Sequence, residues 1–61
     1  MVMIKGDNVL ITYTEQNNKT VLATFYEFSN GMYFFNDVHG IFAVSEKAAE
    51  TGKIVFEVVE E

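Results

Sequence analysis

The dipeptide Asn30-Gly31, between two runs of aromatic residues, limits the folds open to this chain more than any other feature of its sequence. A two-residue type I′ hairpin turn needs positive φ at both central residues, and Asn followed by Gly meets that need at low cost. The flanking residues 20–28 and 32–36 are rich in β-favouring side chains. The sequence therefore predicts an antiparallel hairpin that turns at Asn30-Gly31.

Period-two spacing of apolar residues extends over most of the remaining chain and indicates strands rather than helices. Asn17-Asn18 favours a tight turn after the first strand, because asparagine tolerates the left-handed conformation. Residues 37–40 favour a loop or bend. We expect five strands, over residues 8–15, 20–28, 32–36, 41–44 and 53–60, with Ile54, Phe56 and Val58 on one side of the last strand.

A short helix is expected before the last strand. Ser45 is a good N-cap, the residues from Glu46 to Glu50 favour helix, and Gly52 lies where a left-handed C-cap is expected. Apolar residues between positions 37 and 51 also fit helical spacing. Two interpretations therefore stay open for this segment: a strand followed by a short helix, or one longer helix.

The order of the expected elements resembles that of small SH3-like barrels, in which one helical turn precedes the last strand. The segment Ile4-Lys5-Gly6-Asp7-Asn8-Val9 is similar to the start of the first strand in many such barrels. The resemblance implies a single mainly β (α+β) domain over residues 1–61, either a small five-stranded antiparallel SH3-like barrel or a curled sheet. Because unrelated functions share this fold, the resemblance implies no activity.

The chain has 61 residues and no cysteine. A domain of this length buries only roughly 60% of the surface of its unfolded chain, so its stability is expected to be small. Neither disulfides nor a thiolate metal site can add to that stability. We therefore expect association, as a homo-oligomer or with a protein partner. No apolar run is long enough for a membrane span or a signal peptide, which predicts a cytoplasmic protein that does not bind membranes.

The expected turns also predict which side chains share a face of the sheet. Two-residue turns would place Tyr13 opposite Leu22, Tyr26 opposite Phe35, and Phe28 opposite Tyr33. One face would then carry Val9, Ile11, Tyr13, Leu22, Tyr26, Phe28, Tyr33 and Phe35, and the other would carry Leu10, Val21, Ala23, Phe25, Met32 and Phe34.

Neither of these faces is polar, although an antiparallel sheet with one face in water usually alternates apolar and polar residues. The helix and last strand are expected to cover the face that carries Phe25 and Phe34. The other face is expected to bind a partner or a second copy of the chain, through Tyr13, Tyr26, Tyr33, Phe28 and Phe35. The alternative is a strongly curled barrel that partly buries the tyrosines.

The full chain carries nine carboxylates, four lysines and no arginine, for a formal net charge of −5. Nucleic acids and anionic lipids are bound through Lys and Arg, so no direct binding to nucleic acid or membranes is expected. A protein partner with a basic surface is expected instead. It would face an acidic surface made of Asp37, Glu46, Glu50, Glu57, Glu60 and Glu61, unless these carboxylates only keep the chain soluble.

No residue pattern predicts catalysis. His39 is the only histidine and has one neighbouring carboxylate, Asp37, whereas zinc needs three or four protein ligands. Asp37, His39 and Ser45 have the residue types of a nucleophilic triad, but no Gly-x-Ser-x-Gly motif surrounds the serine. We therefore expect no catalytic residue, no metal and no cofactor.

These observations predict a non-enzymatic protein-interaction module. Small acidic inhibitors of nucleic-acid enzymes, which are frequent in viruses, are similar in size and charge. The chain is therefore expected to act as an inhibitor that blocks a larger, nucleic-acid-handling protein. One alternative is a structural subunit of a homo-oligomer such as a homodimer. Another is a small-ligand module whose pocket is lined by Tyr13, Tyr26 and Tyr33.

Overall fold

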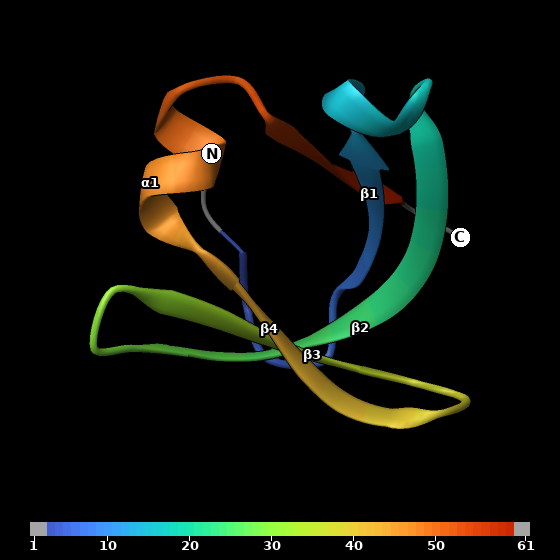
Figure 1. Cartoon of the computed structure of the whole chain (residues 1–61). Coiled ribbons are helices and arrows are strands. Elements are labelled where there is room, and N and C mark those ends of the chain that lie inside the picture. The colour runs from blue at the N-terminus through green and yellow to red at the C-terminus, as the bar shows by residue number, and fades with distance from the viewer. Residues whose placement is uncertain (1–2, 60–61) are drawn as a thin grey trace.

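A computed structural model describes residues 3–59 of the chain, which form one antiparallel sheet with one short α-helix and one 3₁₀ turn (Figure 1). The strands lie in the order β4-β3-β2-β1-β5, so β4 and β5 are the two edges. Within the described residues no ladder joins these edges, and the sheet is open. The predicted five strands and the short helix before the last strand are confirmed. The elements are β1 (Asn8–Tyr13), η1 (Thr14–Gln16), β2 (Lys19–Ser29), β3 (Met32–Asp37), β4 (Gly40–Ser45), α1 (Glu46–Glu50) and β5 (Ile54–Val59).

The longest strand, β2, is shared between two halves of the sheet. Residues 19–24 pair with β1 and residues 24–29 pair with β3, so Thr24 alone belongs to both ladders. Figure 1 shows that β2 bends strongly between these parts and turns the two halves of the sheet toward each other. We call β5, β1 and residues 19–24 the first half-sheet, and residues 24–29, β3 and β4 the second half-sheet.

A bulge and two backbone hydrogen bonds fix this bend. The register with β3 shifts between Phe25 and Glu27, which leaves Tyr26 as the extra residue of a β-bulge, and bulges bend the strand that carries them. The Phe25 amide donates to the Asp7 carbonyl oxygen at 2.8 Å, and the Phe25 carbonyl oxygen accepts from the Gly6 amide at 2.9 Å. The segment before β1 is therefore tied to β2 at its bend.

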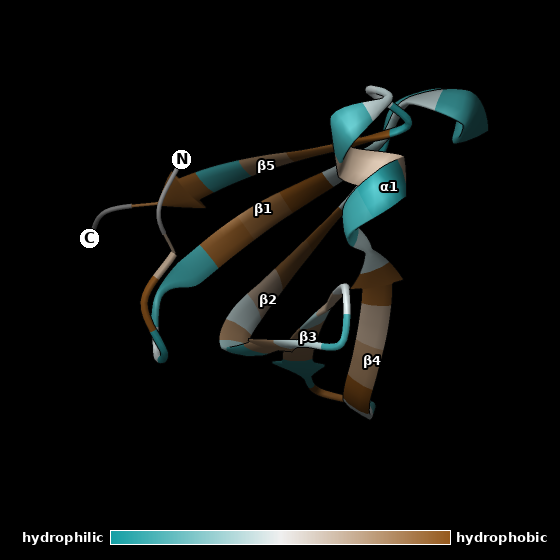
Figure 2. Cartoon of the chain, turned by 90° about the vertical axis from the view of Figure 1, so that its left-hand side faces the viewer, coloured by the Kyte–Doolittle hydropathy of each residue, from teal (hydrophilic) through white to brown (hydrophobic). Residues whose placement is uncertain are grey.

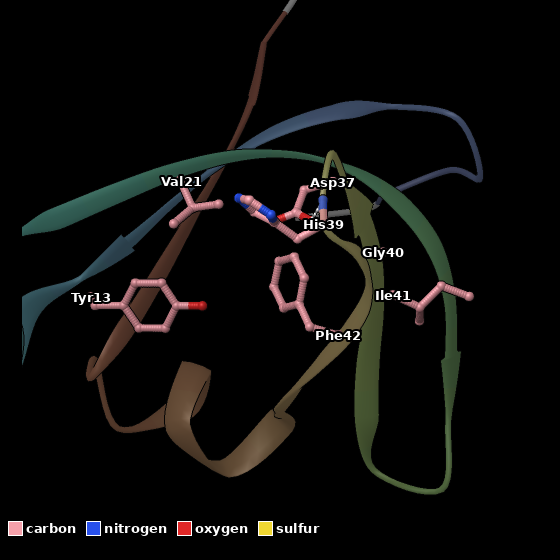
Figure 3. A pocket seen from close by; sticks show the side chains of 7 residues that line it. All are labelled: Tyr13, Val21, Asp37, His39, Gly40, Ile41 and Phe42. Atoms are coloured by element: carbon pink, nitrogen blue, oxygen red, sulfur yellow. Dashed lines mark hydrogen bonds between the residues drawn. The ribbon is translucent and has the colours of Figure 1, made fainter.

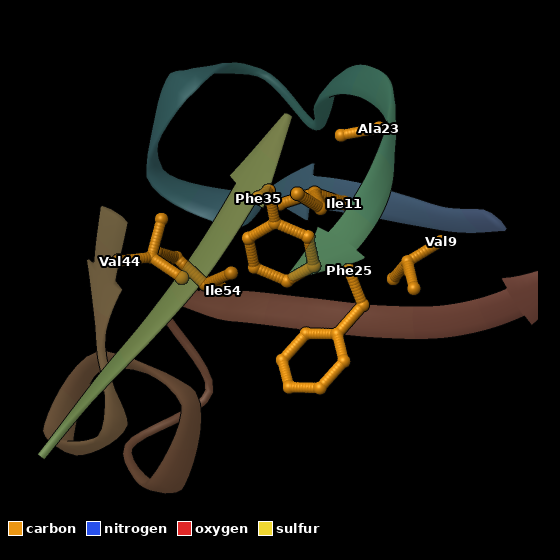
Figure 4. Packing of buried hydrophobic residues seen from close by; sticks show 7 residues of the cluster. All are labelled: Val9, Ile11, Ala23, Phe25, Phe35, Val44 and Ile54. Atoms are coloured by element: carbon orange, nitrogen blue, oxygen red, sulfur yellow. The ribbon is translucent and has the colours of Figure 1, made fainter. Parts of the chain in front are cut away.

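The core lies between the two half-sheets, where side chains from all five strands converge (Figure 4). Phe35 from the second half-sheet and Ile11 from the first are fully buried. The Phe35 ring contacts the rings of Phe25 and Phe56, with centroids 5.6 and 5.4 Å apart, in geometries that aromatic pairs favour. The buried residues are Val9, Ile11, Ala23, Phe25, Phe35, Val44 and Ile54.

The turn between β2 and β3 has the predicted geometry. Asn30 has a φ of 51° and Gly31 a φ of 74°, as a type I′ turn requires. The predicted pairing of Phe28 with Tyr33 is also confirmed. The asparagine–glycine signal therefore located correctly both the turn and the pair Phe28–Tyr33, which is the second pair beyond the turn.

The expected register of β1 with β2 is wrong. The connection is not a two-residue turn but a 3₁₀ turn followed by Asn17 and Asn18, although both asparagines are left-handed as predicted, with φ of 56° and 58°. Tyr13 consequently lies opposite Lys19 instead of Leu22, a shift of three residues. An odd shift moves every side chain of one strand to the other face, because strand side chains alternate.

The pairing of Tyr26 with Phe35 is wrong as well, because the bulge places Phe25 opposite Phe35. Both corrections move Leu22 and Tyr26 away from the face that holds Ile11. The inner face, toward the core, carries Val9, Ile11, Tyr13, Val21, Ala23, Phe25, Phe28, Tyr33, Phe35, Phe42, Val44, Ile54, Phe56 and Val58. The outer face carries Leu10, Leu22, Tyr26, Met32, Phe34, Ile41, Val55 and Val59.

The expectation of two apolar faces is corrected, because the outer face is mixed. Besides its apolar residues it carries polar ones, among them Asn8, Thr12, Thr20, Thr24, Glu27, Asn36 and Glu57. Ile54, Phe56 and Val58 share the inner side of β5, as predicted, whereas Phe34 lies on the outer face, apart from Phe25. Figure 2 shows apolar residues along β1 and β4 and hydrophilic residues on α1.

Ser45 ends β4 and caps α1. Its hydroxyl oxygen accepts a hydrogen bond from the Ala48 amide at 3.1 Å, and Gly52 is left-handed after the helix, with a φ of 80°. The alternative of one helix over residues 37–51 is wrong, because β4 pairs with β3 along its whole length. A period of two brings the buried Val44 and the half-buried Phe42 onto the core, and this packing outweighs the helical spacing.

Two isoleucines provide a matched test of the inner and outer faces. Ile11→Ala leaves a cavity in the core and is expected to lower the free energy of unfolding by about 2–5 kcal/mol. Ile41→Ala removes a side chain that is 64% exposed and is expected to cost less than about 1 kcal/mol. Urea unfolding followed by circular dichroism measures both, and equal losses would contradict the observed faces.

Candidate functional site

The outer face carries large apolar side chains that the chain itself leaves exposed. Leu22 is 60% exposed, Ile41 is 64% exposed and Val55 is 48% exposed. Leu22 lies directly opposite Leu10 in the ladder, whereas Ile41 lies opposite Asn36 and Val55 lies opposite Thr12. Exposed apolar patches on soluble proteins commonly mark contact surfaces.

A shallow hollow of about 310 Å³ extends this face toward the turn between β3 and β4. It is lined by Leu22 and Thr24 from β2, Asn36 from β3, and Val38 at the tip of the turn, among others. Val38 is almost fully exposed. The outer face therefore continues from the middle of the sheet to this turn.

Three charged groups lie on or over the outer face. Glu57 pairs opposite Leu10, and Glu27 pairs opposite Phe34, so both carboxylates share the face with apolar residues. The Lys5 ammonium lies over the Tyr26 ring, 4.8 Å from its centroid, which is a cation–π contact. Tyr26 is thus partly covered by a residue of its own chain.

The structure distributes the predicted acidic residues over several elements. Glu46 and Glu50 lie at the two ends of α1, Glu57 lies on the outer side of β5, and Asp37 ends β3. Glu50 and Asp37 border different hollows. Two further members of the predicted acidic surface, Glu60 and Glu61, lie outside the described residues.

The structure does not bring the predicted aromatic set together on one exposed face. Tyr13 and Tyr33 belong to the inner face, Tyr26 lies on the outer face, and Phe35 is fully buried. Phe28 contacts Tyr33, with ring centroids 4.7 Å apart. A pocket lined by all three tyrosines is therefore not formed, because Tyr13 and Tyr33 border separate hollows.

A second hollow, of about 220 Å³, lies at one end of the inner face (Figure 3). Tyr13 and Phe42 reach into it from β1 and β4, and Asp37 and His39 border it from the β3–β4 turn. Figure 3 shows the Tyr13 hydroxyl directed into this space and the Ile41 side chain directed away from it. We call this space the Tyr13–Asp37 hollow.

Local backbone geometry fixes the polar side of this hollow. One Asp37 carboxylate oxygen, Oδ1, accepts from the backbone amide of His39 at 2.7 Å, which closes the tight β3–β4 turn. Gly40 follows with a φ of 122°, a conformation that L side chains rarely adopt. Burial raises the pKa of the Tyr13 phenol, and the Asp37 carboxylate raises it further because a second negative charge nearby is unfavourable.

The residue types of a nucleophilic triad are not brought together. His39 comes directly before β4, and Ser45 is the last residue of that strand. The full length of β4, at roughly 3.3 Å per residue, therefore separates the two side chains. Ser45 is engaged as the cap of α1. Within residues 3–59, no group of three or more His, Asp or Glu side chains is placed to hold a metal ion.

Three residues that line the two hollows were not among the predicted site residues: Val21, Leu22 and Phe42. The signal for Phe42 was present, because a two-residue turn at Val38-His39 places Phe42 opposite Phe35. The positions of Val21 and Leu22 depend on the length of the β1–β2 loop, which no sequence signal specified.

Comparisons with protein-family models, with curated proteins and with solved structures find no match for this chain. Among the described residues, none of the helical segments has the length and apolar character needed to cross a bilayer.

The titration of Tyr13 tests the geometry of the Tyr13–Asp37 hollow. Asp37→Asn is expected to lower the pKa of Tyr13 while leaving it above the ordinary tyrosine value, because burial is the larger cause of the shift. NMR of the Tyr13 ring as a function of pH measures this. An unchanged pKa in the variant would show that the two groups do not interact.

The same shift has a consequence for stability. The folded chain holds the Tyr13 proton more tightly than the unfolded chain, so the protonated phenol adds to the free energy of unfolding. This stabilisation is complete below the ordinary tyrosine pKa and is lost as pH rises through the pKa of Tyr13 in the folded chain. Tyr13→Phe serves as the control. Phenylalanine has no hydroxyl to ionise, so the variant should lack the part of the high-pH stability loss that comes from Tyr13.

Proposed function

We propose that this chain is a non-enzymatic protein-interaction module that docks its outer face on a larger protein and blocks it. The observation that carries the proposal is the exposure of Leu22, Val38 and Ile41 at or beside the hollow of the outer face, on a sheet whose inner face already forms the core. Within residues 3–59 the elements are the five strands of this sheet, one 3₁₀ turn and one short helix. Desolvating these side chains against a partner is favourable at roughly 25 cal/mol per Å² of apolar area.

We propose a partner with a basic surface. The full chain has a net charge of −5, and Glu27 and Glu57 lie among the apolar residues of the outer face. Complementary charge accelerates association and excludes wrong partners. Basic surfaces commonly bind phosphate groups of nucleic acids, so a docked acidic module would block a nucleic-acid-handling protein.

We also propose that the fold is SH3-like. The bent β2, the pairing of β5 with β1, and the helical turn just before β5 support this assignment. The two half-sheets share one core, as two sheets packed face to face do. The assignment concerns architecture alone, because the same fold serves many functions.

The double variant Leu22→Thr/Ile41→Thr tests the docking surface. Thr is β-branched and suits a strand, so the fold should persist while apolar contact area is lost. A protein captured by the immobilised wild-type chain would be purified and its affinity measured by calorimetry at two salt concentrations. We expect the variant to bind at least about tenfold more weakly, and binding to weaken with salt.

The matched control is Gln16→Thr, in the exposed loop between β1 and β2, which should bind like the wild type. Binding that survives the double variant unchanged would contradict the proposed surface. A stable dimer in light scattering that the double variant dissociates would instead make the outer face an interface between two copies of the chain.

A further inference from the structure

We propose that the Tyr13–Asp37 hollow binds the cationic head of a lysine or arginine side chain. The site combines two aromatic rings with one carboxylate in an open space of about 220 Å³. This inference rests on the proposed function, because the side chain would come from the basic partner. The cation site nevertheless depends on Tyr13 and Phe42 rather than on the exposed apolar residues of the outer face, so the two proposals can fail separately.

The aromatic walls of the hollow suit a cation. Tyr13 and Phe42 reach into it from opposite half-sheets, with the Tyr13 hydroxyl directed into the space (Figure 3). A hydroxyl oxygen can accept from an ammonium or guanidinium group, and the face of an aromatic ring such as that of Phe42 attracts these groups. The Phe42 ring is held in place by stacking on the buried Phe35, with centroids 5.7 Å apart and planes inclined by 21°. The chain already uses the same chemistry on its outer face, where Lys5 lies over Tyr26.

The charge of the hollow also suits a cation. Asp37 uses Oδ1 to accept from the His39 amide, and its carboxylate can accept further hydrogen bonds because each oxygen has two lone pairs. The Tyr13 hydroxyl is a second acceptor. Within the described residues no lysine lines the hollow, although Lys19 lies opposite Tyr13 in the ladder and His39 borders the space. A bound cation would face the carboxylate of Asp37.

The hollow is accessible from the proposed docking surface. Asp37 borders both the Tyr13–Asp37 hollow and the hollow of the outer face that contains Leu22 and Val38. A partner seated on the outer face near the β3–β4 turn therefore lies within reach of the cation site. The apolar surface would provide contact area, and the inserted side chain would provide specificity.

The experiment is an NMR titration of the ¹⁵N-labelled full chain with N-acetyl-lysine amide. Its neutral counterpart, in which the side-chain nitrogen is acetylated, controls for non-ionic contacts. We expect millimolar binding that shifts the amide signals of Asp37, His39, Gly40 and Phe42, and much smaller shifts with the neutral ligand. N-acetyl-arginine amide should shift the same signals.

Asp37→Asn is the matched variant, because the amide oxygen of asparagine can still accept from the His39 amide and preserve the turn. We expect it to weaken binding about twofold to fivefold, which is the scale of one exposed charge interaction. Phe42→Leu keeps apolar bulk while removing one ring and should also weaken binding.

Three outcomes would overturn the cation site: equal shifts with the neutral ligand, unchanged affinity in Asp37→Asn, or shifts at these residues with inorganic phosphate instead of lysine. The single variant Leu22→Thr separates this inference from the proposed function, since Leu22 lines only the hollow of the outer face and the variant should bind N-acetyl-lysine amide like the wild type. If the cation site failed while that variant still lost the partner, only the further inference would be wrong.

Discussion

The bend of β2 is the constraint on which the rest of the structure depends. One strand serves two ladders that meet only at Thr24, and the bulge at Tyr26 together with the backbone bonds of Phe25 to Gly6 and Asp7 holds the change of direction. Without the bend, the two half-sheets would lie side by side and their inner faces would have nothing to pack against. With it, a chain of 61 residues encloses a core in which Val9, Ile11 and Phe35 are fully buried.

The use of all five strands to enclose one core also accounts for the exposed surface. All five strands contribute to one core, and α1 is one short segment between β4 and β5, so within residues 3–59 no second layer lies on the outer side. That side nevertheless carries Leu22, Ile41 and Val55. The Tyr13–Asp37 hollow has a related origin, because the sheet is open and its inner face reaches the surface where the β3–β4 turn passes Tyr13.

Local signals predicted the elements well. Asn30-Gly31 fixed one hairpin, Ser45 and Gly52 marked the helix, and period-two spacing found all five strands. The faces could not be predicted, since they depend on the length of one loop and on one bulge. The 3₁₀ turn before Asn17 and the extra residue Tyr26 leave no distinct trace in the sequence, yet together they reassigned most of β2. Of the residues at the candidate site, Tyr13, Tyr26, Asp37 and Glu57 belong to the predicted binding residues, whereas Leu22, Ile41 and Phe42 do not.

The most direct measurement is the solvent exposure of the four isoleucine δ-methyl groups, from their relaxation enhancement by a neutral gadolinium compound in solution at a concentration where the chain is monomeric. These methyls belong to Ile4, Ile11, Ile41 and Ile54, of which the first and third are exposed and the second and fourth are buried. We expect strong enhancement for Ile4 and Ile41 and weak enhancement for Ile11 and Ile54. Protection of Ile41 equal to that of Ile11 would show that the chain covers its own outer face, and the docking surface would then not exist.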